Sequence, residues 1–397
     1  MSTNPRILIS GASIAGPTLA YWLARQGFRP TVVEQAPALR AGGNGVDLRG
    51  AAVGIAESMG VLPALRDLAT DIRALTFVDA EGRRVAGMPT STFDEPGDIE
   101  VMRGDLARVL HDATAHDVDY RFGDTVDTIT QDGDTVQVSF AGGTSAEFDL
   151  VVGADGLHSR VRNLAVLSEA EAAHPLGIGF ATATVDVSFG ARREVTLHNT
   201  AGRVAGVYRS GNHRDAQAFF AFRTSREFDF PRDRESQIEL LREQFATAGW
   251  EIPTLLDAAT ADPTFYLDAM TQIRMPTWSH GRVGLVGDAA YCATAFSGSG
   301  AALAIEGAHL LATALAESDG HTAAFARYEH AFRPIVRTRQ RSVGTGSAML
   351  VPATNTRIWL RNQLTRLMVL PPLAARVFRA DPPAAAPVDP LRRVTRR

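Results

Sequence analysis

The 397-residue sequence contains no lysine, so all 40 of its basic residues are arginine. This absence excludes every mechanism that depends on a lysine side chain, such as Schiff-base formation. Only one cysteine is present, Cys292, so no disulfide can form within the chain. Because no secretory signal sequence opens the chain either, a cytoplasmic protein is expected.

Long apolar runs and strong net charge are also missing. No segment approaches the roughly 18 apolar residues of a membrane-spanning helix, and residues 358–378 instead resemble an amphipathic helix broken at Pro371 and Pro372. The net charge is −4 and the pI is about 6.2, so the protein has no overall positive electrostatic potential that would favour binding of nucleic acid. The expected partner is a small molecule, and the expected state is a monomer or a weak homodimer.

Spacings typical of metal ligands are absent as well. The ten histidines show neither H-x-x-x-H nor H-E-x-x-H, so no metal is expected. We also find no Ser-His-Asp pattern, and the sequence identifies no catalytic side chain.

Three apolar runs predict buried strands, and each ends at a turn that contains glycine: residues 6–10, 148–153 and 282–287. A helical pattern at 15–26 and another strand at 31–34 complete a β-α-β unit. Because the carboxyl ends of parallel strands meet at one edge of a sheet, these turns are expected to gather polar groups in one place.

Residues 175–275 have a different hydrophobic pattern from the segments before them. Apolar and polar residues alternate in 181–187, 194–198, 203–209 and 217–223, which predicts a mostly antiparallel sheet. The expected fold class is α/β, with a Rossmann-type domain, a second β-sheet domain for the substrate and C-terminal helices. The expected boundaries are 1–174 and 276–350 for the Rossmann domain, 175–275 for the β-sheet domain, 351–380 for a bridging helix and 381–397 for a disordered tail.

The turn after the first strand reads Gly11-Ala-Ser-Ile-Ala-Gly16. Glycines at its ends allow a tight turn and let a pyrophosphate approach the N-terminus of the next helix. Ser13 replaces the middle glycine of the usual pattern, and Ala15 belongs to the same turn. Glu34 follows at close to the ~20-residue spacing of a ribose-binding acid, which favours FAD or NAD over NADP.

Two later motifs separate FAD from NAD. They read Gly153-Ala-Asp-Gly-Leu-His-Ser-Arg-Val-Arg162 and Gly287-Asp-Ala-Ala290. With the glycine loop before them, they make the chain resemble the class A FAD-dependent monooxygenases, the family of para-hydroxybenzoate hydroxylase, and especially its tetracycline-inactivating and polyketide-hydroxylase members. The resemblance covers nearly the whole chain and implies a Rossmann-type FAD-binding domain that holds FAD non-covalently.

The resemblance assigns further residues to the cofactor. It implies that Asp155 in the first motif serves FAD and the reduced nicotinamide, and that Asp288 accepts a hydrogen bond from a ribityl hydroxyl. It also implies that Gly298, Gly300 and Ala301 begin a helix whose N-terminus faces the pyrimidine end of the flavin. The positive end of that helix would stabilise the reduced, anionic flavin.

Three more positions match by resemblance alone. Arg103 matches an arginine near the FAD phosphates and ribityl chain, Asp47 matches a flavin-contacting aspartate, and Arg40 matches an arginine that helps to bind NADPH. The histidine and proline usual near Asp288 in this family are Tyr291 and Phe296 here, which leaves the substrate contacts of this loop open.

For this family the chemistry belongs to the cofactor. NADPH or NADH reduces FAD, oxygen forms a flavin 4a-hydroperoxide, and this species hydroxylates an aromatic or polyketide-like small molecule. Baeyer-Villiger oxygenation or epoxidation by the same peroxide stays open, as does a non-catalytic flavoprotein that sequesters a small molecule. A flavin-dependent halogenase is excluded, because its lysine and its W-x-W-x-I-P segment are both missing.

The alternating sheet is expected to supply the substrate wall. Phe220 and Phe222 share one face of their strand, and Tyr208 lies on a neighbouring strand. His198 could act there as an acid or a base, and Phe296 is a further candidate. The alternatives are a role in the core for the aromatic residues and a hydrogen-bonded sheet histidine for His198.

Overall fold

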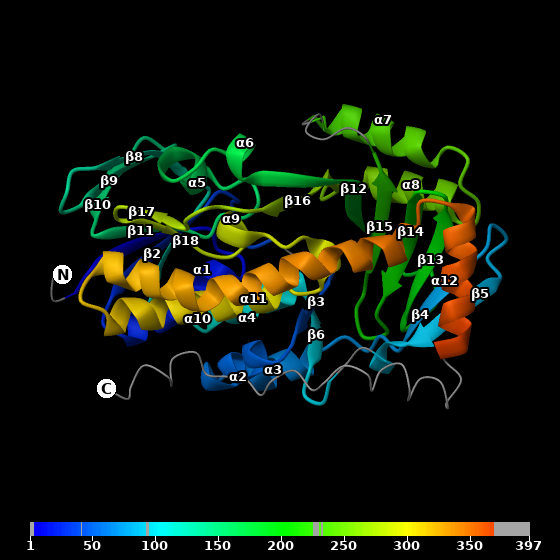
Figure 1. The fold of residues 1–397 in the computed structure, drawn as a ribbon, viewed down its shortest axis with the longest axis horizontal. Helices are drawn as coiled ribbons and strands as arrows, with labels where there is room; N and C mark the ends of the chain where they lie inside the picture. The colour runs from blue at the N-terminus through cyan, green and yellow to red at the C-terminus, as the bar shows by residue number, and fades with distance from the viewer. Residues whose placement is uncertain (1–3, 41, 93–94, 225–229, 232, 369–397) are drawn as a thin grey trace. The chain divides into compact units, whose positions relative to one another are not determined.

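The computed structural model describes residues 4–40, 42–92, 95–224, 230–231 and 233–368 (Figure 1). The chain divides into two compact units, which are considered separately here. Unit 1 comprises Met1–Ala69, Gly97–His174 and Thr271–Val343, and unit 2 comprises Thr70–Pro96, Pro175–Met270 and Gly344–Arg397. The predicted tail at 381–397 and the end of the predicted C-terminal helix lie outside the described residues.

Unit 1 is built on a six-stranded sheet in the order β17-β18-β11-β1-β2-β7. Its strands are β17 (Ser279–His280), β18 (Val283–Leu285), β11 (Leu150–Gly153), β1 (Arg6–Ser10), β2 (Arg29–Glu34) and β7 (Asp119–Phe122). All neighbours are parallel except β17 and β18. The middle of β1, from Ile7 to Ile9, is fully buried, as expected for a parallel strand covered on both faces.

Helices and two small sheets complete unit 1. One small sheet has three strands, β8 (Val126–Gln131), β9 (Val136–Phe140) and β10 (Ser145–Phe148). The other has two strands, β3 (Gly45–Leu48) and β6 (Ile99–Met102). The helices are α1 (Ala15–Arg25), α2 (Ala51–Ser58), α3 (Leu62–Asp67), α4 (Arg103–Asp112), α5 (Arg160–Ala165), α6 (Glu169–Ala172), α9 (Asp288–Tyr291), α10 (Gly300–Glu317) and most of α11 (His321–Leu350), with the short η2 (Ala295–Ser297). The helix α1 packs against α10. This packing places the glycine-rich turn before α1 in the same unit as the start of α10.

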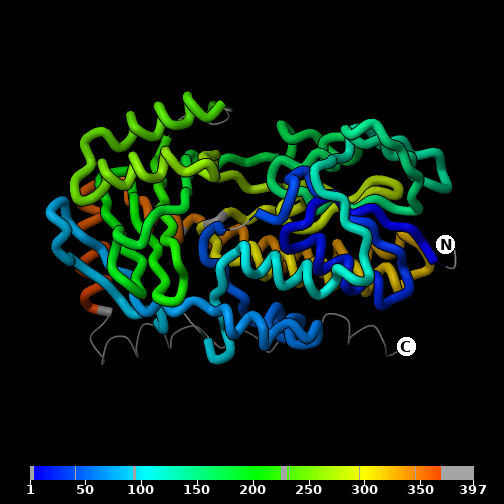
Figure 2. The backbone as a smooth tube through the Cα atoms, turned by 180° about the vertical axis from the view of Figure 1, so that it is seen from behind, coloured from blue at the N-terminus to red at the C-terminus, as the bar shows by residue number. Residues whose placement is uncertain are grey.

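Unit 2 contains a seven-stranded sheet in the order β16-β12-β15-β14-β13-β4-β5. Its strands are β16 (Tyr266–Ile273), β12 (Ala173–Val185), β15 (Ala216–Arg223), β14 (Arg203–Arg209), β13 (Glu194–Thr200), β4 (Ala74–Val78) and β5 (Arg84–Pro89); its helices are α7 (Arg234–Phe245), α8 (Ile252–Ala261), α12 (Asn355–Met368) and the short η1 (Thr90–Thr92). The four segments predicted from alternation correspond to β12–β15, and they pair antiparallel. In Figure 2 the two green helices α7 and α8 run beside these strands.

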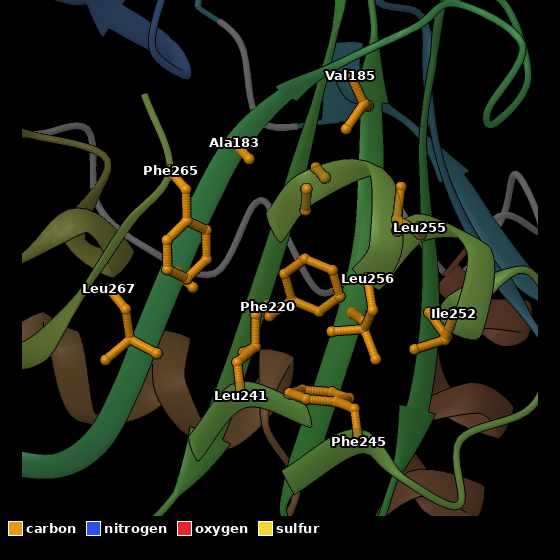
Figure 3. Packing of buried hydrophobic residues seen from close by; sticks show 14 of the residues in the cluster. Ala183, Val185, Phe220, Leu241, Phe245, Ile252, Leu255, Leu256, Phe265 and Leu267 are labelled. Atoms are coloured by element: carbon orange, nitrogen blue, oxygen red, sulfur yellow. The ribbon is translucent and has the colours of Figure 1, made fainter. Parts of the chain in front are cut away.

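The main core of unit 2 lies between one face of this sheet and the helices α7 and α8. Phe220 of β15 and Leu241 of α7 are both fully buried there, and Phe220 meets Phe245 edge to face at 5.3 Å between ring centroids. Figure 3 shows these side chains meeting between the strands and the helices, together with Leu255 and Leu256 of α8. Burial of these aromatic and aliphatic groups is the principal stabilising contribution in this layer.

Residues 70–96 belong to unit 2, although the sequence analysis placed them in the Rossmann domain. The reason is a long-range pairing, because β4 runs parallel to β13 with Thr76 opposite Thr196. The helix α12 also belongs to unit 2, where Arg361 stacks over the ring of Phe77 at 3.6 Å. Among the described residues, no helix is both long enough and apolar enough to cross a membrane.

Candidate cofactor-binding site

A pocket of about 200 Å³ lies in unit 1 where β1, β2 and β11 end. Parallel strands direct their carboxyl ends to this edge, as the sequence pattern predicted. The pocket brings together six of the predicted residues: Gly11, Ser13, Glu34, Arg40, Arg103 and Asp155. The other predicted cofactor residues lie outside its lining.

The glycines of the first turn are required by close backbone approach. Gly11 has a φ of 109°, which side chains rarely tolerate, and a Cβ there would overlap the carbonyl oxygen of Ala154. A Cβ on Gly16 would overlap the carbonyl oxygen of Gly11. The turn is therefore too tight for a side chain at either glycine, and Ser13 between them lines the pocket.

Glu34 joins the end of β2 to this turn. Its Oε2 accepts a hydrogen bond from the Ala12 N–H at 2.9 Å, and its Oε1 accepts one from the Ala36 N–H at the same distance. Each carboxylate oxygen keeps a further lone pair. The residue can thus fix the turn and still accept a hydrogen bond from a ligand hydroxyl.

Asp155 organises the turn between β11 and α5. Its carboxylate accepts hydrogen bonds from the Ser159 hydroxyl at 2.5 Å and from the Val161 N–H at 3.1 Å. Burial raises the pKa of Asp155, and these hydrogen bonds act in the opposite direction. Arg162, which is fully buried, donates to the carbonyl oxygen of Ala289 at 3.1 Å and so ties this motif to the Gly287–Ala290 motif.

Asp288 and Arg103 lie close enough to interact electrostatically. The Asp288 residue is exposed, but nearby protein atoms partly desolvate its carboxyl group and raise its pKa. The positive charge of Arg103 opposes this shift. Arg103 also donates to the hydroxyl of Ser13 at 3.2 Å. Cys292 is buried and its pKa is raised well above the ordinary value for a thiol, first by desolvation, so it stays a neutral thiol.

The N-terminus of α10 faces open space. A Cβ on Gly300 would meet no atom within 4 Å, whereas one on Gly298 would lie 3.4 Å from Asp47 Oδ2. Gly298 also has a φ of 57°, a conformation that favours glycine. Ala301 is buried in the first turn of the helix. An 18-residue helix with this open start presents free N–H groups and a positive dipole end.

Glu306 lies further along α10, and the effect of burial on its pKa can be tested by experiment. Burial raises its pKa from 4.5 to about 7, and Arg339 acts in the opposite direction. Because the folded-state pKa is the higher one, ionised Glu306 destabilises the fold above about pH 7, and this penalty fades as the pH falls toward 4.5. Glu306→Gln should raise the free energy of unfolding by about 1–3 kcal/mol at pH 8.5 and by less than about 1 kcal/mol at pH 5.

Urea denaturation at the two pH values measures this difference. The matched control is Glu57→Gln on α2, because Glu57 is exposed. An equal change at both pH values for Glu306→Gln would show that the effect is not ionisation of the carboxyl group.

The structure corrects the predicted substrate wall. Phe220 and Phe222 are buried in the core beneath α7 and α8, so they are not available to a ligand. His198 is paired with Ala205, which is opposite Phe220, so the register puts it on the same buried face. Tyr208 lies on the other face of the sheet, because it is opposite Gln217.

Tyr291 and Phe296, the two departures from the family pattern, lie in unit 1. The Tyr291 hydroxyl accepts a hydrogen bond from Tyr328 at 3.0 Å, and its ring lies 4.8 Å from that of Trp278. Tyr291 is therefore part of a buried aromatic cluster, while Phe296 is half-buried in η2. No group of His, Cys, Asp and Glu side chains suited to a metal ion occurs in the part of the chain that the structure describes.

Sequence reasoning missed several residues of the pocket. His158 and Arg160 line it, and both lie inside the Gly153–Arg162 motif, so their position in that motif was an available signal. Thr125 also lines the pocket, but nothing in its sequence neighbourhood indicates this.

Comparison with known proteins gives the family. The sequence model of the FAD binding domain family matches residues 5–341. An uncharacterized protein of Mycobacterium tuberculosis (strain CDC 1551 / Oshkosh) is 41% identical over 340 residues, which cover 84% of this chain and 91% of that protein. A flavin-dependent monooxygenase of Legionella longbeachae serogroup 1 (strain NSW150) is 35% identical over 344 residues, covering 86% and 88%.

Comparison with solved structures supports the same family. The crystal structure of the tetracycline destructase Tet(51) is 33% identical and has a TM-score of 0.82, covering 92% of this chain and 96% of that one. The match extends over both units of the fold. The chain belongs to the FAD-dependent monooxygenase family.

Proposed function

We propose that the protein uses NAD(P)H and O2 to hydroxylate an aromatic or polyketide-like small molecule while FAD is bound non-covalently. The observation that carries this proposal is the edge of the unit 1 sheet, where the glycine turn, Glu34 and Arg103 line one pocket. The relative named flavin-dependent monooxygenase supports the oxygenation, and the solved structure named tetracycline destructase supports a polycyclic substrate that carries oxygen substituents.

The residues of unit 1 suit FAD group by group. The tight turn at Gly11 and Gly16 and the N-terminus of α1 would hold the pyrophosphate. Glu34 would accept a hydrogen bond from the adenosine ribose, and Arg103 would neutralise phosphate charge. Asp288 would accept from a ribityl hydroxyl, and Asp155 would keep the second turn in place.

When bound, FAD supplies hydride acceptance and the activation of molecular oxygen. The chain would bind and orient it and stabilise charge. The open N-terminus of α10, with Gly298 and Gly300, would stabilise negative charge at the pyrimidine end of the flavin. Arg40, which is exposed in the pocket lining, is the candidate for a contact with NAD(P)H.

The proposed substrate-binding surface is the face of the unit 2 sheet that carries Tyr208. The opposite face, which carries Phe220, is covered by α7 and α8. Phe219 and Phe180 point to this face, because Phe219 is opposite Gly206 and Phe180 is opposite Ala221. Both are half-buried, unlike Phe220. We propose that these aromatic rings of unit 2 contact the substrate, and Phe296 of unit 1 stays a separate candidate.

Glu34→Gln is expected to weaken FAD binding about tenfold. A glutamine keeps one acceptor oxygen, so it cannot accept from both the Ala12 and Ala36 N–H groups. One hydrogen bond of the turn is lost and a buried donor is left unpaired. Titration of apoprotein with FAD, followed by flavin fluorescence, measures the Kd, with Glu57→Gln as control. An unchanged Kd would remove Glu34 from the cofactor site.

Oxygen labelling tests the proposed reaction. Purified protein with FAD is incubated with 18O2, with NADPH or NADH, and with a panel of phenols, polycyclic ketones and tetracyclines. A compound that accelerates NAD(P)H oxidation and gains one labelled oxygen on a ring carbon supports hydroxylation. Label in an inserted ester or an epoxide favours the alternative oxygenations, and no labelled product from any compound would contradict the proposal.

A further inference from the structure

A second pocket, of about 420 Å³, lies elsewhere in unit 1 and shares no lining residue with the cofactor pocket. Trp278 and Tyr291, both buried, form part of its wall. The rest comes mainly from α11 and from the segment around Arg274 that follows β16. Nothing in the proposed oxygenation uses this pocket.

The pocket is strongly cationic. Its basic lining residues are His174, Arg274, Arg333, Arg337 and Arg341. Glu329 forms an ion pair with Arg333 at 2.5 Å. No acidic residue occurs in the described lining, and within the described chain no carboxylate pairs with Arg274, Arg337 or Arg341. Three positive charges therefore remain without compensation around one concave surface.

One of these arginines, Arg274, is held in place by the buried amide of Gln272. Gln272 is 1% exposed, and its Oε1 accepts from Nε and Nη2 of Arg274 at 3.0 and 2.6 Å. Its Nε2 donates to the carbonyl oxygen of Gln340 on α11 at 2.8 Å, while Gln340 Nε2 donates to that of Ile273 at 2.8 Å. This reciprocal pair orients the Arg274 guanidinium through a neutral acceptor, so its charge is kept.

The other arginines form a stripe on α11. Arg333, Arg337 and Arg341 are spaced four residues apart and so lie on one side of the helix. Like charges at this spacing destabilise a helix, and only the first of them is offset by Glu329. Arg333 also has a structural role, because it donates to the carbonyl oxygen of Met275 at 2.8 Å and lies over the ring of Trp278. No carboxylate of the described chain offsets Arg337 and Arg341, and a bound anion would stabilise both.

We propose that this pocket binds a phosphate-bearing anion, either free phosphate or pyrophosphate or the phosphate of a nucleotide. Guanidinium groups present planar pairs of donors that match phosphate oxygens, and several converging arginines favour a multivalent anion over a single carboxylate. Arg274 is already oriented for this contact, and the exposed Arg337 and Arg341 can move toward the ligand.

Calorimetric titration tests the proposal on the full-length protein saturated with FAD, so that the cofactor pocket does not take up the probe. The probes are pyrophosphate, 2′,5′-ADP and 5′-ADP. The double variant Arg337→Gln/Arg341→Gln should weaken binding of the best probe by at least about tenfold, because two charge-assisted contacts are removed. The control, Arg66→Gln/Arg357→Gln, removes the same charge at exposed positions outside the pocket.

Two results support the proposal and distinguish the source of the phosphate. Tighter binding of one nucleotide than of pyrophosphate indicates a nucleotide ligand, and equal or tighter binding of pyrophosphate indicates recognition of the phosphate groups alone. The proposal is overturned if no probe binds the wild-type protein at millimolar concentration. It is also overturned if the control weakens binding as much as the pocket variant, or if the pocket variant binds like wild type.

Discussion

Gly300→Val is expected to leave the fold intact and to weaken FAD binding by roughly a hundredfold, equivalent to about 2.7 kcal/mol. A Cβ at this position would meet no atom within 4 Å outside its chain neighbours and its own helix backbone, so the fold leaves space at the start of the added side chain. Valine is not a worse helix former than glycine. The isopropyl group would instead occupy the space in front of the α10 N-terminus and cover its free N–H groups.

Gly54→Val is the matched control, because Gly54 lies on the exposed side of α2 and a Cβ there also meets open space. Urea denaturation and FAD titration are measured for both variants. The assignment of the α10 N-terminus to the flavin is wrong if Gly300→Val binds FAD and turns over like wild type. A loss of stability only in Gly300→Val would point to a structural role instead.

Gly16 cannot provide the same test. A Cβ there would overlap the carbonyl oxygen of Gly11, so any substitution disturbs the turn itself. Loss of FAD from a Gly16 variant would not separate a damaged fold from a blocked site. Gly300 is more informative, because a Cβ there meets no atom within 4 Å and a loss of FAD binding would point to the ligand.

The cofactor end of the fold could be predicted from the sequence because its signals are local. The glycine turn, the strand β2 and Glu34 follow one another within a single β-α-β unit, so their spacing alone indicates the phosphate-binding edge. The motif at Gly153–Arg162 was likewise predictable as a turn at a strand end. Its internal hydrogen bonds, such as those from Ser159 and Val161 to Asp155, were not.

The second unit was harder to predict because its signals are not local. Alternation correctly predicted β12–β15, but it says only that neighbouring residues point to opposite faces. It does not show which face the helices α7 and α8 cover, so the burial of Phe220 and Phe222 beneath them could not be predicted. The parallel pairing of β4 with β13 joins segments far apart in sequence, and nothing in either segment indicates its partner.

The arginine stripe on α11 is visible in the sequence but does not by itself indicate a binding site. Its spacing of four residues was visible in the predicted helix 322–341, but a run of exposed arginines is common on helices. Only the structure shows that Arg274, which is distant in sequence, lines the same pocket. The Gln272–Gln340 pair that connects the two segments has no sequence signature.

Phe220→Ala is expected to lower the free energy of unfolding by about 3–5 kcal/mol, the usual cost of removing a buried phenylalanine. Phe220 is fully buried and packs against Phe245, so its removal leaves a cavity between β15 and α7. The protein that remains folded should still couple NAD(P)H oxidation to product, because the side chain faces away from the proposed substrate face. Urea denaturation measures the first effect, and labelled product per NAD(P)H measures the second.

Phe219→Ala is the control on the same strand, because its ring lies on the opposite face and is only half-buried. Its removal should cost less stability and should release more hydrogen peroxide per NAD(P)H, since a loosely held substrate loses the geometry needed for oxygen transfer. The two variants thus separate packing from substrate positioning within one pair of adjacent residues. Uncoupling by Phe220→Ala with no loss of stability, together with wild-type coupling in Phe219→Ala, would reverse the assignment of the two faces.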